Sequence, residues 1–78
     1  MNYTYFLNYA NVGQKVVVKS LALPHCFSER LSVLGFEEGS VLCILNTAPF
    51  CGLLQIATPF GVFCLRREVA CKIEVANV

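Results

Sequence analysis

The sequence contains no aspartate, and its only histidine is His25. A Ser–His–Asp triad could therefore form only with a glutamate in place of the aspartate, and calcium or magnesium sites built on Asp are excluded. A zinc site with two or three histidines from one chain is excluded as well. The sequence also lacks a phosphate-binding loop of the G-x-x-x-x-G-K type. We therefore expect a protein that is not an enzyme and that has no cofactor.

Charged residues are scarce, at 14% of the 78 residues, whereas an average soluble domain has about 25%. The formal net charge is +1, which leaves no basic surface of the kind that binds nucleic acid. Hydrophobic residues make up 56% of the chain, and this composition excludes intrinsic disorder. The length accommodates one domain, which we expect to span residues 1–78.

Long apolar runs are missing too. The longest run extends from Val41 to Leu45, whereas a membrane span needs about 20 apolar residues. The chain has no basic residue before Lys15, so its beginning does not resemble a secretory signal. We expect a cytoplasmic protein that does not insert into the membrane itself.

Cysteine is the one reactive residue type that the chain has in quantity. The number is odd and no C-x-x-C pair occurs, which argues against both a secreted disulfide scaffold and a thiol-redox protein. We expect reduced thiols that act as small buried hydrophobic residues. The five cysteines are Cys26, Cys43, Cys51, Cys64 and Cys71.

Glycine and proline divide the chain into short apolar segments. Their composition and alternation predict strands at residues 14–23, 40–47, 53–58, 62–65 and 72–75. One short helix is expected at about residues 25–34, and a single turn follows Arg66. Five short strands favour a mainly β fold, a small barrel whose closure removes exposed strand edges.

The end of the helix is marked in detail. Phe27, Leu31 and Leu34 have the i, i+4, i+7 spacing of one helical face. Gly35 then supplies a left-handed residue, and Phe36 follows at the position that packs back on Leu31 in a Schellman ending. The residues expected to be structural are Leu31, Leu34, Gly35 and Phe36, with Gly39 in the next turn.

Two predicted hairpin turns, at 49–52 and 59–61, carry aromatic residues where polar ones are usual. Phe50 and Phe60 either fold over the core or are offered to a partner, and on neighbouring tips they would form one patch with Leu53.

Two further groups have an open role. Arg66 and Arg67 either pair with nearby glutamates, pack over the barrel or contact a partner. The N-terminal aromatic residues either cover the open end of the barrel or take part in weak self-association; they are Tyr3, Tyr5, Phe6 and Tyr9.

His25, Cys26 and Glu29 cluster at the start of the helix. His25 and Glu29 are separated by four residues and share a helical face, a spacing that can hold a divalent metal. Because tight sites usually need at least three protein ligands, a solvated polar face is the more economical interpretation.

The ordered set of motifs resembles the FeoA family, over roughly residues 10–76. The resemblance lies in Leu31-x-x-Leu34-Gly35-Phe36, x-x-Gly39, a strand ending in Ala48-Pro49, Gly61-x-x-x-Leu65-Arg66-x-x-Glu68 and Ile73-x-Val75. It implies an SH3-like barrel with a helix inserted after the first strand.

The resemblance also implies a function. A FeoA-like protein would be a cytoplasmic accessory protein of bacterial ferrous iron uptake, and its expected partner is the membrane iron transporter FeoB, which has a cytoplasmic G-protein domain. A partner surface would include Phe50, Leu53, Phe60, Arg66 and Arg67. The alternative is a metal-binding or metal-sensing barrel like the C-terminal domain of metal-dependent repressors, with His25, Cys26 and Glu29 as its ligands.

Overall fold

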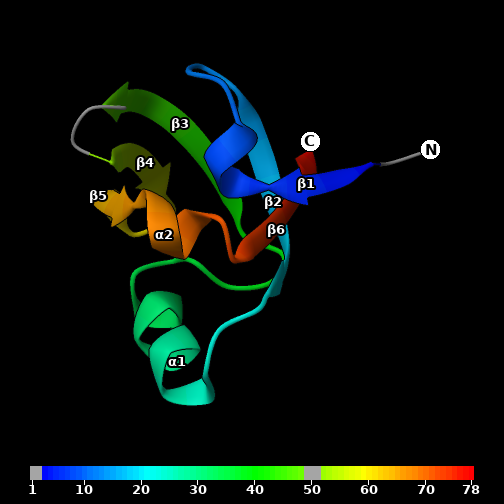
Figure 1. The fold of residues 1–78 in the computed structure, drawn as a ribbon, viewed down its shortest axis with the longest axis vertical. Coiled ribbons are helices and arrows are strands. Elements are labelled where there is room, and N and C mark those ends of the chain that lie inside the picture. Colours follow the sequence, from blue (N-terminus) through cyan, green and yellow to red (C-terminus); the bar gives the residue numbers. More distant parts are fainter. Residues whose placement is uncertain (1–2, 49–51) are drawn as a thin grey trace.

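The computed structural model describes residues 3–48 and 52–78 of the chain (Figure 1). The strands bend around a common core, and α1 projects beyond one end of them. The elements in chain order are β1 (Thr4–Phe6), the 3₁₀ turn η1 (Leu7–Tyr9), β2 (Lys15–Leu21), α1 (His25–Val33), β3 (Val41–Ala48), β4 (Leu53–Thr58), β5 (Gly61–Arg66), α2 (Arg67–Ala70) and β6 (Ile73–Asn77).

Alternating apolar residues build the core, because successive side chains of a strand point to opposite faces. In β2, Val16 and Val18 are buried while Lys15 and Lys19 are exposed. The same alternation buries pairs of residues in the other long strands: Leu42 and Ile44, Leu54 and Ile56, Ile73 and Val75. The expected mainly β fold with one short α-helix before β3 is therefore confirmed.

Within residues 3–48 and 52–78, the sheet has six strands rather than the expected five, and it is not closed. Its strands are all antiparallel, in the order β1-β6-β2-β3-β4-β5. Two edges therefore remain, at β1 and at β5, where a closed barrel would have none. The long helix consequently follows the second strand and not the first.

The additional strand comes from the N-terminal segment. Tyr5 of β1 pairs with Val75 of β6, and Leu7 in η1 is completely buried in the core. The Tyr5 hydroxyl donates to Asn77 Oδ1 (2.6 Å) and accepts from Gln14 Nε2 (2.8 Å). This segment is thus an integral part of the fold and not only a cover or a self-association arm.

The helix α1 ends as its sequence indicates. Gly35 has φ 102°, Phe36 N donates to Leu31 O (2.9 Å) and Gly35 N donates to Ser32 O (3.0 Å). These are the two hydrogen bonds of a Schellman motif. The helical face shared by Phe27 and Leu31 is buried only in part. Leu31 is in the core, whereas the first turns of α1 extend past the sheet and Phe27 stays 39% exposed.

Candidate docking surfaces

The turn between β4 and β5 is fastened to the end of α1. Thr58 Oγ1 donates to Leu34 O (2.6 Å), and the amide of Phe60 donates to Thr58 Oγ1 (3.1 Å). A Cβ atom on Gly35 would lie 2.6 Å from Thr58 Oγ1 and 3.4 Å from the ring of Phe60. Gly35 therefore allows both the left-handed backbone of the cap and the close approach of the turn.

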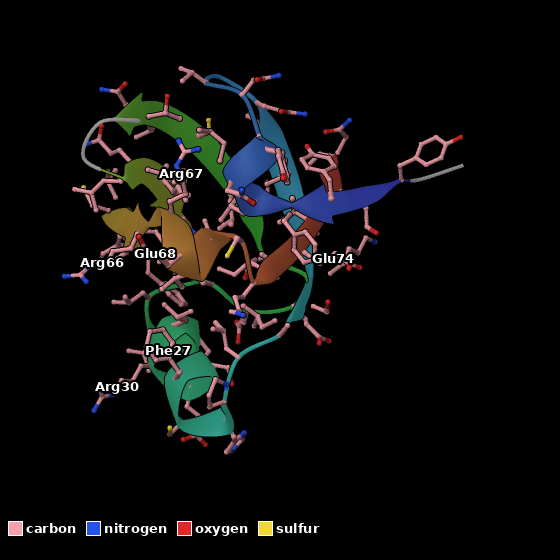
Figure 2. The ribbon with its side chains drawn as sticks, viewed as in Figure 1. Phe27, Arg30, Arg66, Arg67, Glu68 and Glu74 are labelled. Carbon is pink, nitrogen blue, oxygen red and sulfur yellow. The ribbon has the colours of Figure 1, made fainter. Side chains whose placement is uncertain are left out.

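This end of the molecule exposes two aromatic rings, which we call the α1–turn surface. Phe60 is 65% exposed at the tip of the turn, and Phe27 is exposed on the helical stripe that leads to Leu34. Figure 2 shows Phe27 and Arg30 on α1, with Arg30 extending outward from the helix. The exposed parts of these two rings are available to a partner.

A second surface lies on the outer face of β3, β4 and β5. A shallow hollow of about 240 Å³ opens there. Arg66 lies beside it, because its register partner is Leu53. The hollow is lined by Asn46, Thr47, Leu53, Gln55 and Cys64.

The expected single patch of Phe60 with Leu53 does not form. Leu53 begins β4 and Thr58 ends it, so the two turns that flank this strand lie about 17 Å apart. Consecutive hairpins of an antiparallel sheet alternate between its two ends, whereas a single patch would need both turns at the same end. Phe50 lies outside the described residues.

The two arginines at the β5–α2 junction have different environments. Arg66 is exposed and Arg67 is half-buried. In Figure 2 Arg66 points outward from β5, whereas Arg67 points toward β3. Within residues 3–48 and 52–78, neither arginine forms an ion pair with a glutamate. Arg66 is thus the one of the two that is open to a partner.

The polar cluster at the start of α1 is only partly assembled. His25 Nε2 lies 2.9 Å from Glu29 Oε1, and both side chains are largely exposed. An exposed pair of this kind contributes about 0–1 kcal/mol. In the part of the chain that the structure describes, no group of three His, Cys or Glu side chains comes together as metal ligands. Cys26 therefore does not complete a site with this pair.

The expectation of buried cysteines is wrong for most of those described. Cys43 is half-buried, whereas three others are exposed: Cys26, Cys64 and Cys71. The thiol of Cys71 donates to Glu68 O (2.9 Å). Cys26 lies on the outward side of α1 and Cys64 on the outward side of β5, and the opposite side of each element carries core residues. Composition alone does not reveal this placement. Cys51 lies outside the described residues.

These features define a class of protein: a small antiparallel β module that exposes aromatic and apolar surfaces at two places. Among the described residues, no helix has the length and apolar character needed to span a bilayer.

The FeoA domain model matches residues 6–77, and the chain belongs to the FeoA family. FeoA of Chlorobium tepidum is 26% identical with a TM-score of 0.86, and the match covers 94% of this chain and 70% of that one. FeoA of Stenotrophomonas maltophilia, solved with zinc, is 26% identical with a TM-score of 0.73, covering 96% and 88%. It is described as an SH3 domain protein, and a role as a ferrous iron transport activating factor has been suggested for it. The expected SH3-like fold is confirmed.

The same architecture occurs in transcriptional regulators. A manganese-dependent transcriptional repressor matches with a TM-score of 0.88 and 18% identity. The match covers all of this chain and 44% of the repressor, and at this identity it shows the fold alone. No curated protein sequence matches the chain significantly.

Proposed function

We propose that the chain is a non-catalytic accessory protein of ferrous iron uptake, which docks on the cytoplasmic part of a FeoB-type transporter and modulates it. The observation that carries this proposal is the FeoA domain, which extends over residues 6–77. The proteins of similar structure support it, because the FeoA of Stenotrophomonas maltophilia has been linked to activation of ferrous iron transport. The proposal places the protein in the cytoplasm, at the membrane only through its partner.

The α1–turn surface is the contact that we assign to this docking. It combines Phe60, Phe27 and the cation of Arg30 on one end of the molecule. Aromatic and arginine side chains dominate the binding energy of protein interfaces when they are desolvated in the centre of a contact. The rigid connection of the turn to Leu34 through Thr58 holds Phe60 in place before binding, which lowers the entropy cost of docking.

Modulation requires that the module bind two states of its partner with different affinity. A ligand that binds both conformations equally shifts neither, however tightly it binds. A docking module therefore acts when the contact for Phe60 and Phe27 exists in one state of the transporter's cytoplasmic part and is altered in the other. This mechanism assigns no bond-making step and no cofactor to the chain.

The test is a binding titration with the isolated cytoplasmic part of the transporter. We expect the double variant Phe27→Ser, Phe60→Ser to raise the dissociation constant at least about tenfold, because two hot-spot rings are lost. The matched control is Tyr9→Ser, which removes a ring of 71% exposure from η1. The proposal is wrong if the double variant, folded as judged by an unchanged melting temperature, binds as tightly as the control.

A further inference from the structure

The strand β5 forms an edge of the sheet, and the described part of the chain does not protect it against pairing. It pairs with β4 over its whole length, from Gly61 opposite Thr58 to Arg66 opposite Leu53, without a register shift. Natural edge strands are usually short, charged, bulged or interrupted by proline. The other edge, β1, is short, with three residues. In β5 the only charge is Arg66 at its end.

The phase of the β4–β5 ladder determines which backbone groups face outward. The backbone N–H of Arg67 donates to Gly52 O (2.7 Å), so the backbone N–H and C=O groups of Arg67 face β4. Backbone groups alternate along an antiparallel strand. Consequently the backbone groups of Phe63 and Leu65 also form hydrogen bonds with β4, whereas the N–H and C=O groups of three residues point away from the sheet. These three are Val62, Cys64 and Arg66.

Nothing in the described part of the chain covers this edge. No backbone hydrogen bond from residues 3–48 or 52–78 reaches Val62 or Cys64 from outside the β4 ladder. The side chain of Val62 is 53% exposed, and those of Cys64 and Arg66 are exposed as well. In Figure 1, β5 lies at the margin of the strands. The edge thus presents regularly spaced donors and acceptors to solvent.

We propose that β5 is the contact through which two copies of this chain associate, as antiparallel strands of one continuous sheet centred on Cys64. With Cys64 opposite its counterpart, Val62 of each copy lies opposite Arg66 of the other. Every outward-facing residue then exchanges both hydrogen bonds with a partner, as in a symmetric isologous interface. This proposal is independent of the docking of the α1–turn surface.

The positive charge of Arg66 favours this register over the other symmetric registers. Centring the pair on Cys64 puts the two Arg66 side chains at opposite ends of the paired strands. Centring it on Leu65 instead would set Arg66 opposite Cys64 and bring the two like charges together, which is destabilising. Centring it on Phe63 would leave Arg66 opposite the turn residue Phe60 and sacrifice strand pairing. The strand is therefore self-complementary in one register only.

The contact should be weak, because one strand pair buries less than the roughly 800 Å² per partner of a stable dimer. We expect the amide signals of Val62, Cys64 and Arg66 to shift with protein concentration between about 0.05 and 1 mM in NMR spectra. Their hydrogen exchange should slow over the same range. The proposal is overturned if these signals do not change up to 1 mM.

Two substitutions at one position separate edge pairing from other causes. Cys64→Pro removes an outward N–H that the ladder with β4 does not use, and proline is tolerated at such edge positions. The matched control, Cys64→Ser, keeps that N–H. We expect the proline variant to lose the concentration dependence and the serine variant to keep it. A folded proline variant that associates like the control overturns the proposal.

Cross-linking tests the register without relying on a proline variant that folds. Paired residues at this kind of position have Cα atoms about 5.5 Å apart, within the range that a disulfide spans. A chain with Cys64 as its only cysteine should form disulfide dimers with copper phenanthroline, in which two Cu(II) ions accept the two electrons and water takes up the two thiol protons. A chain with only Cys26, which is also exposed, should do so at least fivefold more slowly. Equal rates overturn the proposal.

A last outcome identifies a different occupant of the edge. If the protein stays monomeric at 1 mM while the transporter's cytoplasmic part slows exchange of the Val62 and Cys64 amides, the edge accepts a strand of that partner. That result overturns pairing between copies.

Discussion

At the scale of single residues, Gly35 has the strongest constraint. Its φ of 102° is unfavourable for any residue with a Cβ atom, and the Cβ would lie 2.6 Å from Thr58 Oγ1. Gly39 is a natural comparison, because its φ of 87° is similar but nothing lies within 4 Å of its Cβ position. The two glycines therefore separate backbone strain from steric overlap.

We predict that Gly35→Ala lowers the free energy of unfolding by about 2 kcal/mol or more, since strain and overlap add. Gly39→Ala should cost about 1–2 kcal/mol from strain alone. Urea unfolding of both variants measures the difference. If Gly35→Ala lowers the free energy of unfolding no more than Gly39→Ala, steric overlap with the turn between β4 and β5 does not contribute.

Tyr5 makes stability depend on pH. Burial raises the pKa of Tyr5 above its usual value of 10.0. The unfolded chain therefore loses this proton at lower pH than the folded one, and the free energy of unfolding falls as pH rises above about 10. The hydroxyl also donates to Asn77 Oδ1, which a phenolate cannot do.

We predict that the stability advantage of the native chain over Tyr5→Phe shrinks between pH 9 and pH 11, in urea unfolding at each pH. Tyr9→Phe serves as the control, because Tyr9 is exposed in η1 and its hydroxyl has no hydrogen bond to the described residues. A constant difference between the native chain and Tyr5→Phe across this range would contradict the prediction.

At the scale of elements, the sequence predicted those with strong periodicity or clear end signals. The helix 25–34 and the strand 53–58 are observed as His25–Val33 and Leu53–Thr58. The N-terminal strand was missed, because Thr4–Phe6 is too short to show an alternation. It is stabilised by pairing with β6, a contact between the two ends of the chain that local pattern cannot reveal.

The N-terminal segment gives an element-scale prediction. Leu7 in η1 is completely buried, so Leu7→Ala should lower the free energy of unfolding by about 2–5 kcal/mol. Tyr9→Ala in the same element should change it by less than about 0.5 kcal/mol. Thermal or urea unfolding distinguishes the two. Equal, small effects would mean that this segment is not part of the core.

At the scale of the whole molecule, the sequence indicated surplus apolar surface but not its location. Phe60 was identified as a candidate contact, and it is exposed. The predicted patch of Phe60 with Leu53 is wrong, because such a patch depends on which end of the sheet each turn occupies. The exposure of Phe27 was not predicted, since helical periodicity shows which residues share a face and not whether anything lies opposite it.

The edge at β5 was unexpected for a similar reason. Five short strands predicted a closed barrel, whereas the additional strand joins β6 and leaves β5 at the end of the sheet. Closure depends on the relative position of all strands, which a list of segments does not contain. Arg66 and Cys64 acquire their exposed positions from this arrangement.

The most direct test of the docking account is the rate of ferrous iron uptake in cells that contain the transporter. The wild-type chain should change this rate relative to cells without the chain, and Tyr9→Ser should act like wild type. Phe27→Ser, Phe60→Ser should return uptake to the rate of cells without the chain while the protein remains folded and abundant. A wild-type rate with the double variant, or no effect of the wild-type chain, would contradict the account.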